Sequence, residues 1–227
     1  MLEVGAEILR GAPFEEVLNK IKATEVARGA GRTTGAFYNI WKDQRDYRRD
    51  LIAYVLSPAR FRVDGDTRHE IADQLSRPEF DLVELIRVAA NLNFDGVKDE
   101  PYMPLQYALV ASLVTNRDVH AELKRMYDEL NDGLVPLYEA MLERSRRTMC
   151  RPYTVRTLAI VMMALAEGLH IRWMVDAGAV PDDVGGPPPG AIQNDGERWG
   201  LFAACVYPLF MAMTEPATDT REGSSGG

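Results

Sequence analysis

Glu167 and His170 have the spacing Glu-x-x-His inside an apolar stretch, and this spacing places two metal ligands on one face of a helix. Di-iron carboxylate bundles need a second such pair and two further inward glutamates. The other histidines, His69 and His120, have no glutamate three residues before them. Half of the motif leaves a metal-dependent helical-bundle enzyme as one hypothesis, which metal analysis of the purified protein would test.

The stretch "GAGRTTG", residues 29–35, raises a second chemical possibility, a phosphate-binding loop. In a dinucleotide-binding fold such a loop follows a strand, and a Walker-type loop ends in Gly-Lys-Ser/Thr. Here the preceding "KATEVARGA" has helical spacing, and no Gly-Lys-Ser/Thr follows. The stretch therefore predicts a corner between two helices and not a nucleotide site.

The residues on both sides of this corner have the pattern of a helix-turn-helix. Val26, Ala27 and Ala30 give the first helix an apolar stripe with small residues at the point of close approach. Gly31 ends that helix, where glycine adopts a left-handed conformation without steric cost. Thr33 is placed to cap the next helix with its hydroxyl.

The second helix of the corner, expected over residues 34–41, has one buried and one exposed face. We expect Phe37, Ile40 and Trp41 to be buried because they follow the i, i+3, i+4 spacing. Short or polar residues that could contact a DNA groove and its phosphates occupy the other face: Thr34, Gly35, Tyr38 and Asn39. At this point an ordinary helical corner inside a bundle remains the alternative.

Charge is distributed unevenly along a chain whose formal net charge is -8. Residues 18–62 contain 10 Lys/Arg against 4 Asp/Glu, whereas residues 63–227 contain 15 against 26. A basic segment joined to a larger acidic one predicts an anionic partner for the first and not for the second. The two cysteines, the absence of a signal peptide and an apolar run of only nine residues (158–166) predict a cytoplasmic protein, associated with the nucleoid when bound to DNA.

Period-3.6 spacing recurs along the whole chain and period-two alternation does not, so we expect an all-α fold. A small N-terminal helix-turn-helix bundle precedes a larger helical domain in this interpretation. The predicted boundaries are 1–57 for the DNA-binding domain, 58–215 for the effector-binding and dimerisation domain, and 216–227 for a disordered tail. Helices are expected at about 2–10, 22–30, 34–41, 44–56, 67–76, 81–95, 104–115, 118–147, 154–177 and 197–214. The Pro/Gly-rich segment 178–196 is expected to be a partly mobile loop.

Residues 23–56, "ATEVARGAGRTTGAFYNIWKDQRDYRRDLIAYVL", resemble the DNA-binding unit of TetR-family transcriptional regulators. The family pattern "IA..AGvs.gtlY.yF.sKe.L" matches without a gap at Val26-Ala27, Ala30-Gly31, Thr33, Gly35, Phe37-Tyr38, Trp41 and Asp43. Arg32 departs from the usual small apolar residue, and Gln44 replaces the common lysine.

The resemblance implies a set of DNA-contacting residues and the roles of some of them. Tyr38 is expected to contact phosphate, and Thr34 and Asn39 to contact base edges. The implied DNA-binding set is Lys22, Thr24, Arg32, Thr33, Thr34, Gly35, Tyr38, Asn39, Lys42 and Gln44.

The larger domain is implied to dimerise and to bind a small effector. Residues 164–176 and 198–213 resemble the last two helices of the family, which form a four-helix dimer interface. The expected effector-binding set is Tyr102, Tyr107, Met126, Tyr127, Leu130, Met162, Met163, Glu167, His170 and Trp173. The expected interface set is Leu158, Leu165, Leu169, Arg172, Trp199, Phe202, Ala203, Val206 and Phe210.

The sequence thus favours a homodimeric, ligand-responsive regulator without enzymatic activity, metal or cofactor. We expect a repressor that a small apolar effector releases from a near-palindromic double-stranded operator. Besides the metal-dependent enzyme, a ligand-binding helical dimer that does not bind DNA is an alternative, suggested by the altered turn at Arg32 and by the lack of a basic arm before the first helix.

Overall fold

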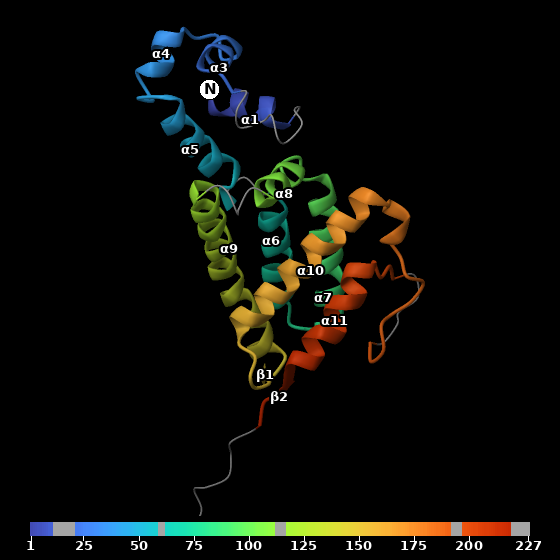
Figure 1. Ribbon diagram of the computed structural model, residues 1–227. Coiled ribbons are helices and arrows are strands. Elements are labelled where there is room, and N and C mark those ends of the chain that lie inside the picture. The colour runs from blue at the N-terminus through green and yellow to red at the C-terminus, as the bar shows by residue number, and fades with distance from the viewer. Residues whose placement is uncertain (11–20, 59–61, 112–116, 192–196, 219–227) are drawn as a thin grey trace, which may run out of the picture. The chain divides into compact units, whose positions relative to one another are not determined.

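The computed structural model describes residues 1–10, 21–58, 62–111, 117–191 and 197–218, and within these ranges it confirms the all-α prediction (Figure 1). Two three-residue strands were not predicted, because three residues are too few to show a period of two. The helices are α1 (Leu2–Arg10), α3 (Ala23–Gly29), α4 (Thr34–Tyr38), α5 (Gln44–Val55), α6 (Arg62–Ser76), α7 (Leu82–Asp99), α8 (Met103–Ala111), α9 (Arg117–Arg144), α10 (Val155–Val175) and α11 (Leu201–Met213), with a 3₁₀ turn η2 (Ala177–Ala179). Strand β1 (Arg147–Met149) pairs antiparallel with β2 (Thr214–Pro216).

The chain forms two compact units, each built from separate stretches of sequence. The first unit comprises residues 1–62 and 99–130, and the second comprises 63–98 and 131–227. The DNA-binding domain predicted over residues 1–57 lies in the first unit, together with residues 99–130, which we had placed in the effector domain. Of the tail predicted over 216–227, Pro216 belongs to β2, and residues 219–227 lie outside the described residues.

Helix ends around the predicted corner are fixed by the expected residues. Gly31 has a φ of 63°, and the N–H groups of Gly31 and Arg32 donate to the carbonyls of Arg28 (3.0 Å) and Ala27 (2.8 Å). This pair of bonds is a Schellman motif, which ends α3. The Thr33 hydroxyl accepts from the Ala36 N–H at 3.2 Å and starts α4. The corner is therefore confirmed as a short, tightly capped connection.

The position of Ile40 differs from the prediction. Ile40 is 61% exposed, whereas Phe37 and Trp41 are 0% and 6% exposed as expected. Helix α4 ends at Tyr38, so the period of 3.6 does not continue to Ile40. The rings of Phe37, Trp41 and Tyr47 form a cluster with centroids 4.7–5.0 Å apart, and this cluster holds α4 against α5.

Replacing Gly31 with alanine should lower the free energy of unfolding by about 1–2 kcal/mol, because an L-residue is strained in the left-handed region. No atom lies within 4 Å of a Cβ at this position, so the cost is purely conformational. Gly35, inside α4, is the matched control: alanine there should stabilise by about 0.5–1 kcal/mol. Denaturant unfolding measures both, and equal effects of the two substitutions would contradict the assignment of strain to Gly31.

Helix α1 connects the corner to the rest of the first unit. Two glycines allow close packing around it: a Cβ at Gly29 of α3 would overlap Val4 of α1, and a Cβ at Gly5 of α1 would overlap the Tyr47 hydroxyl of α5. The Glu3 carboxylate accepts hydrogen bonds from the Tyr54 hydroxyl and, at 2.9 Å, from the Tyr102 hydroxyl. Through these two bonds Glu3 links α1 to α5 and to Tyr102, the residue immediately before α8.

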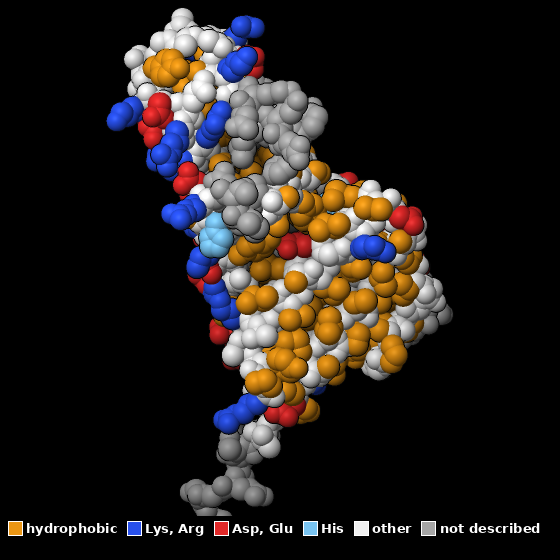
Figure 2. All heavy atoms as spheres, in the orientation of Figure 1, with side chains coloured by type: hydrophobic (Ala, Val, Ile, Leu, Met, Phe, Trp, Pro, Cys, Tyr) orange, Lys and Arg blue, Asp and Glu red, His pale blue; other side chains and the backbone are white. Residues whose placement is uncertain are grey.

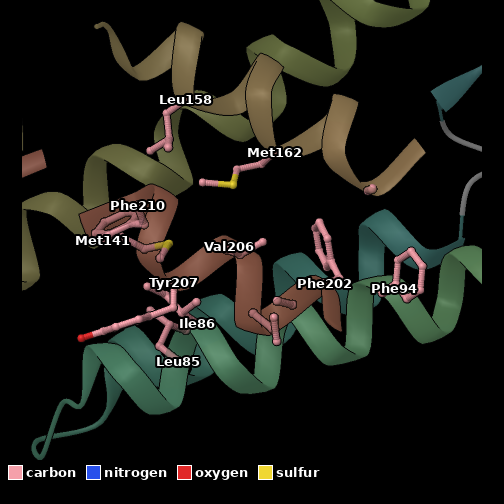
Figure 3. Packing of buried hydrophobic residues seen from close by; sticks show 14 of the residues in the cluster. Leu85, Ile86, Phe94, Met141, Leu158, Met162, Phe202, Val206, Tyr207 and Phe210 are labelled. Carbon is pink, nitrogen blue, oxygen red and sulfur yellow. The ribbon is translucent and has the colours of Figure 1, made fainter. Parts of the chain in front are cut away.

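The core of the second unit lies among α7, α9, α10 and α11 (Figure 3). Leu158 and Met162 of α10 point toward Phe202, Val206 and Phe210 of α11. The same cluster includes side chains of α7 and α9: Leu85, Ile86, Phe94 and Met141. Trp199, which is 0% exposed, completes the cluster at the start of α11. Burial of this contiguous apolar surface is the main favourable term in the folding of the unit.

The Pro/Gly-rich segment before α11 is attached to the second unit at several points. The Val184 N–H donates to the Trp199 carbonyl at 2.8 Å, and the Tyr207 hydroxyl donates to the Gly190 carbonyl at 2.8 Å. Lys98 forms an ion pair with Asp182 at 2.5 Å. Residues 192–196 of the loop that we predicted to be partly mobile lie outside the described residues.

Candidate nucleic-acid interface and apolar outer face

The predicted DNA-contacting residues all lie at the surface of the first unit. Thr34 and Gln44 are partly exposed, and the other eight are exposed: Lys22, Thr24, Arg32, Thr33, Gly35, Tyr38, Asn39 and Lys42. Tyr38 is 48% exposed, and its ring meets the buried Phe37 ring edge-on with centroids 5.3 Å apart. Packing of the buried Phe37 therefore fixes the orientation of α4, so that Thr34, Tyr38 and Asn39 lie together on its exposed side.

Thr33, which belongs to this set, and the neighbouring Asp43 cap helices. The Thr33 hydroxyl caps α4, which leaves its O–H free to donate. Asp43, between Lys42 and Gln44, caps α5 by accepting from the N–H groups of Arg45 (2.8 Å) and Asp46 (2.9 Å). The hydrogen bond from the Asp46 N–H is the largest cause of the lowered pKa of the Asp43 carboxyl. This cap fixes the α4–α5 connection.

The cations near the corner are not equivalent. Lys42 and Arg45 are exposed. Arg49 lies 3.6 Å from the carboxylates of both Asp46 and Asp50, which partly neutralise it. Lys42 and Arg45 therefore carry positive charge that is less neutralised than that of Arg49.

The predicted effector-binding residues are divided between the two units. Tyr102, Tyr107, Met126, Tyr127 and Leu130 belong to the first unit; Met162, Met163, Glu167, His170 and Trp173 belong to the second. Met126 is completely buried, and Tyr102 is 7% exposed with its hydroxyl directed to Glu3. The sequence could not predict the hydrogen bond between Tyr102 and Glu3, because the two residues are 99 positions apart.

His170 is the most deeply buried ionisable side chain on α10. It is 2% exposed, and its ring stacks on Trp173 with centroids 5.7 Å apart and planes 18° from parallel. Burial lowers the pKa of the imidazole because desolvation disfavours its charged form. His170 is therefore neutral near pH 7, and it can donate from one ring nitrogen and accept at the other.

This burial predicts a pH dependence of stability. A histidine whose pKa is lower in the folded state takes up protons preferentially when unfolded, so the free energy of unfolding should fall as the pH drops below about 6.5. One such group contributes a slope of at most about 1.4 kcal/mol per pH unit. Urea unfolding between pH 5 and 8 should show this slope in the wild type and a weaker one in His170→Leu. A slope unchanged by the substitution would assign the effect to another group.

Most of the predicted interface residues are core residues of the second unit. Six of the nine are at most 8% exposed: Leu158, Trp199, Phe202, Ala203, Val206 and Phe210. Leu165 and Leu169 are partly exposed, and Arg172 is exposed. The six buried side chains pack against other residues of the same chain. They therefore hold α10 and α11 in place, but they do not form the exposed surface of these helices.

A different set of side chains forms the outer face of α10 and α11. On α10 the exposed stripe is Ile160, Ala164, Gly168, Ile171 and Val175, and on α11 the stripe continues with the partly exposed Leu201 and Cys205 and the exposed Pro208 and Ala212. We call these nine residues the apolar outer face. Figure 2 shows hydrophobic side chains gathered over the two helices, with few charged side chains among them. Both helices are apolar on nearly every side, so sequence periodicity could not decide which side faces outward.

Comparison with known proteins identifies this arrangement. The sequence matches no protein-family model and no curated protein sequence. A TetR-family transcriptional regulator from Mesorhizobium loti shares the fold with a TM-score of 0.59 and 13% identity, over 94% of this chain and 96% of that one. The chain has the TetR fold.

Two further structures that are similar to this chain are transcriptional regulators named FadR. FadR from Bacillus subtilis, in complex with stearoyl-CoA, has a TM-score of 0.52 and 12% identity, over 78% of this chain and 86% of that one. Thermus thermophilus FadR, a transcriptional repressor in complex with lauroyl-CoA, has a TM-score of 0.51 and 14% identity, over 100% and 97% of the two chains. The TetR fold agrees with the resemblance found in residues 23–56.

Two further features of this TetR-fold chain are relevant to the metal-dependent enzyme and to the predicted cytoplasmic location. In the described parts of the chain, no group of three or more His, Cys, Asp and Glu side chains is placed to hold a metal ion. Helix α10 is long and apolar enough to cross a membrane by length and composition, with a mean hydropathy of 1.5 over 18 residues. The nine-residue run considered in the sequence thus belongs to the N-terminal half of a longer apolar helix, whose exposed side is part of the apolar outer face.

Proposed function

We propose that this protein is a ligand-responsive, DNA-binding transcriptional regulator that acts as a homodimer. The observation that carries the proposal is the exposed side of α4 in a TetR fold. Thr34, Tyr38 and Asn39 are displayed there over a packed aromatic cluster. The metal-dependent enzyme has no comparable observation in its favour.

Each exposed group has a role that its chemistry allows. The Tyr38 hydroxyl can donate to a phosphate oxygen, while Thr34 and Asn39 are short enough to reach base edges in the major groove. Lys42 and Arg45 add charge at the flank, so operator affinity should fall steeply with salt concentration. Arg49 contributes less because Asp46 and Asp50 hold it.

The apolar outer face is proposed to bind a second copy of the chain. A contiguous apolar surface of this kind marks an interaction site in a protein exposed to water. Ala164 and Gly168 are small, and a Cβ at Gly168 would have no neighbour within 4 Å, so a partner helix can approach closely. A twofold pairing places two copies of α4 in symmetric positions, which predicts a near-palindromic operator.

Long-chain acyl-CoA is the first effector class to test, because two proteins with the same fold are described in complex with stearoyl-CoA and lauroyl-CoA. The second unit has apolar and adaptable side chains for an acyl chain, among them Met162 and Met163. An effector that favours the state with misplaced DNA-reading helices releases the operator. If the DNA-binding state is favoured 99:1 without effector, reversing this ratio requires the effector to bind the other state about 10⁴-fold more tightly.

Selection from random duplex DNA at low salt tests the proposal. The wild type should retain a near-palindromic motif, and Tyr38→Ala and Asn39→Ala should lose it. Tyr153→Ala is the matched control, since Tyr153 is a 43% exposed tyrosine of the second unit. Release of the retained DNA by lauroyl-CoA would support a repressor with an acyl-CoA effector. Recovery of no motif would overturn DNA binding and favour the ligand-binding helical dimer.

A further inference from the structure

Ile40, two residues after the end of α4, is the most exposed large apolar side chain among the described residues of the first unit. It is 61% exposed, although the next residue, Trp41, is only 6% exposed. The Ile40 N–H donates to the Phe37 carbonyl at 3.0 Å, so the backbone fixes where the side chain lies. A single exposed apolar residue is ordinary on a protein surface. The surroundings of Ile40, and not its exposure alone, indicate a role.

Ile40 lines a hollow beside the corner between α3 and α4. The hollow has a volume of about 480 Å³, and the described residues that line it are Met1, Ala30, Arg32, Ala36 and Ile40. Ala36 precedes Ile40 by four residues, so the two side chains lie on the same side of this helical segment. The hollow thus has mainly apolar walls, and the one charged side chain among its described walls is the exposed Arg32.

The hollow borders the surface that is proposed to contact DNA. Arg32 and Ala36 flank Thr34 along the chain, and the exposed Asn39 directly precedes Ile40. A pocket for a small molecule buries most of its ligand, whereas Ile40 leaves this hollow open to solvent. An open hollow with apolar walls, a cationic side chain and no acidic side chain among its described residues suits the edge of a large anionic partner. Double-stranded DNA is the partner that is continuous with the neighbouring surface.

The chemistry of the major groove restricts what an apolar side chain can recognise there. Of the four bases, only thymine presents an apolar group in the major groove, namely its C5-methyl. An apolar side chain gains free energy from this methyl by removing both from water, and burial of one methyl strengthens binding by about fourfold. The polar edges of the bases remain for Thr34 and Asn39, which can form hydrogen bonds.

We propose that Ile40, supported by Ala36, contacts the C5-methyl of a thymine in each operator half-site, and that Arg32 pairs with a neighbouring phosphate. The inference rests on the proposed function, because it assigns a base to the DNA-reading helix. It gives a role in base specificity to a residue that the helical spacing had placed in the core. A methyl contact uses no hydrogen bond, so it can be removed without disturbing the hydrogen bonds of the same base pair.

The test replaces each thymine of the selected operator with deoxyuridine, which removes only the methyl group, and measures binding of the full chain by fluorescence anisotropy. At one thymine position the wild type should lose about fourfold in affinity per half-site. Ile40→Ala should weaken binding to the thymine operator by a similar factor and should no longer respond to deoxyuridine at that position. Arg32→Gln should weaken binding to both operators equally and lower the salt dependence by about one counterion per contact.

Leu92→Ala is the matched control, because Leu92 is an exposed apolar residue of the second unit (37%). It should retain both the affinity and the response to deoxyuridine. Urea unfolding should show that Ile40→Ala is as stable as the wild type, since the side chain is mostly exposed.

Three results would overturn the thymine contact and leave DNA binding intact. The first is an operator without thymine in its half-sites, and the second is a wild type that responds to no deoxyuridine substitution. The third is a response that persists in Ile40→Ala but disappears in Thr34→Ser, which would assign the methyl contact to Thr34. Recovery of no operator motif would overturn DNA binding and the thymine contact together.

Discussion

Replacing Ile171 with aspartate should make the protein monomeric and weaken its binding to operator DNA by about 10²–10⁴-fold. Ile171 is 43% exposed and lies in the middle of the apolar outer face of α10. In a dimer its carboxylate would be buried against apolar side chains without a partner, which is highly unfavourable. A monomer has one DNA-reading helix pair, so it loses the effective concentration that links two half-sites.

Sedimentation velocity and operator titration would measure the two effects of Ile171→Asp. Leu92→Asp is the control, since Leu92 is an exposed leucine of α7 (37%) outside the apolar outer face. We expect that variant to remain dimeric and to bind DNA normally. A dimeric Ile171→Asp protein would contradict the proposed pairing through α10 and α11.

Replacing Phe37 with alanine should destabilise the first unit by about 3–5 kcal/mol and abolish DNA binding, although Phe37 itself is proposed to touch no DNA. The side chain is 0% exposed, with its ring centroid 5.0 Å from Trp41 and 4.9 Å from Tyr47. Its removal leaves a cavity under α4. The loss is a large share of the 5–15 kcal/mol by which a typical domain is stable.

The adjacent residue should behave in the opposite way. Tyr38→Ala removes a 48% exposed ring, so its unfolding free energy should change little while operator binding is lost. Urea unfolding monitored by tryptophan fluorescence separates the two, because Trp41 belongs to the aromatic cluster. Equal stability losses in the two variants would mean that Tyr38 also has a structural role.

The features that the sequence predicted well depend on local chemistry. Thr33 was expected as a cap, and Gly31 as a left-handed residue, because each acts on backbone groups within a few positions of itself. The boundaries of the helix-turn-helix helices follow from these residues. The same locality explains why Tyr38 and Asn39 were correctly expected at the surface.

The features that the sequence did not predict depend on distant partners. Helix α10 is apolar around most of its circumference, so Leu158 and Ile160 could not be assigned to the core and to the outside from spacing alone. Ile40 follows the helical pattern, but α4 ends two residues before it.

The division of the chain into two interleaved units has a consequence for its synthesis. The Glu3 carboxylate meets Tyr54 early, but Tyr102 emerges from the ribosome only after residues 63–98, which belong to the other unit. The first unit cannot complete its contacts until residues up to 130 have been made, and the second must wait for residues beyond 200. A fragment that stops at residue 62 therefore lacks part of its own folding unit. The nascent chain must hold its N-terminal helices in an unfinished state until more than half of the polypeptide has been translated.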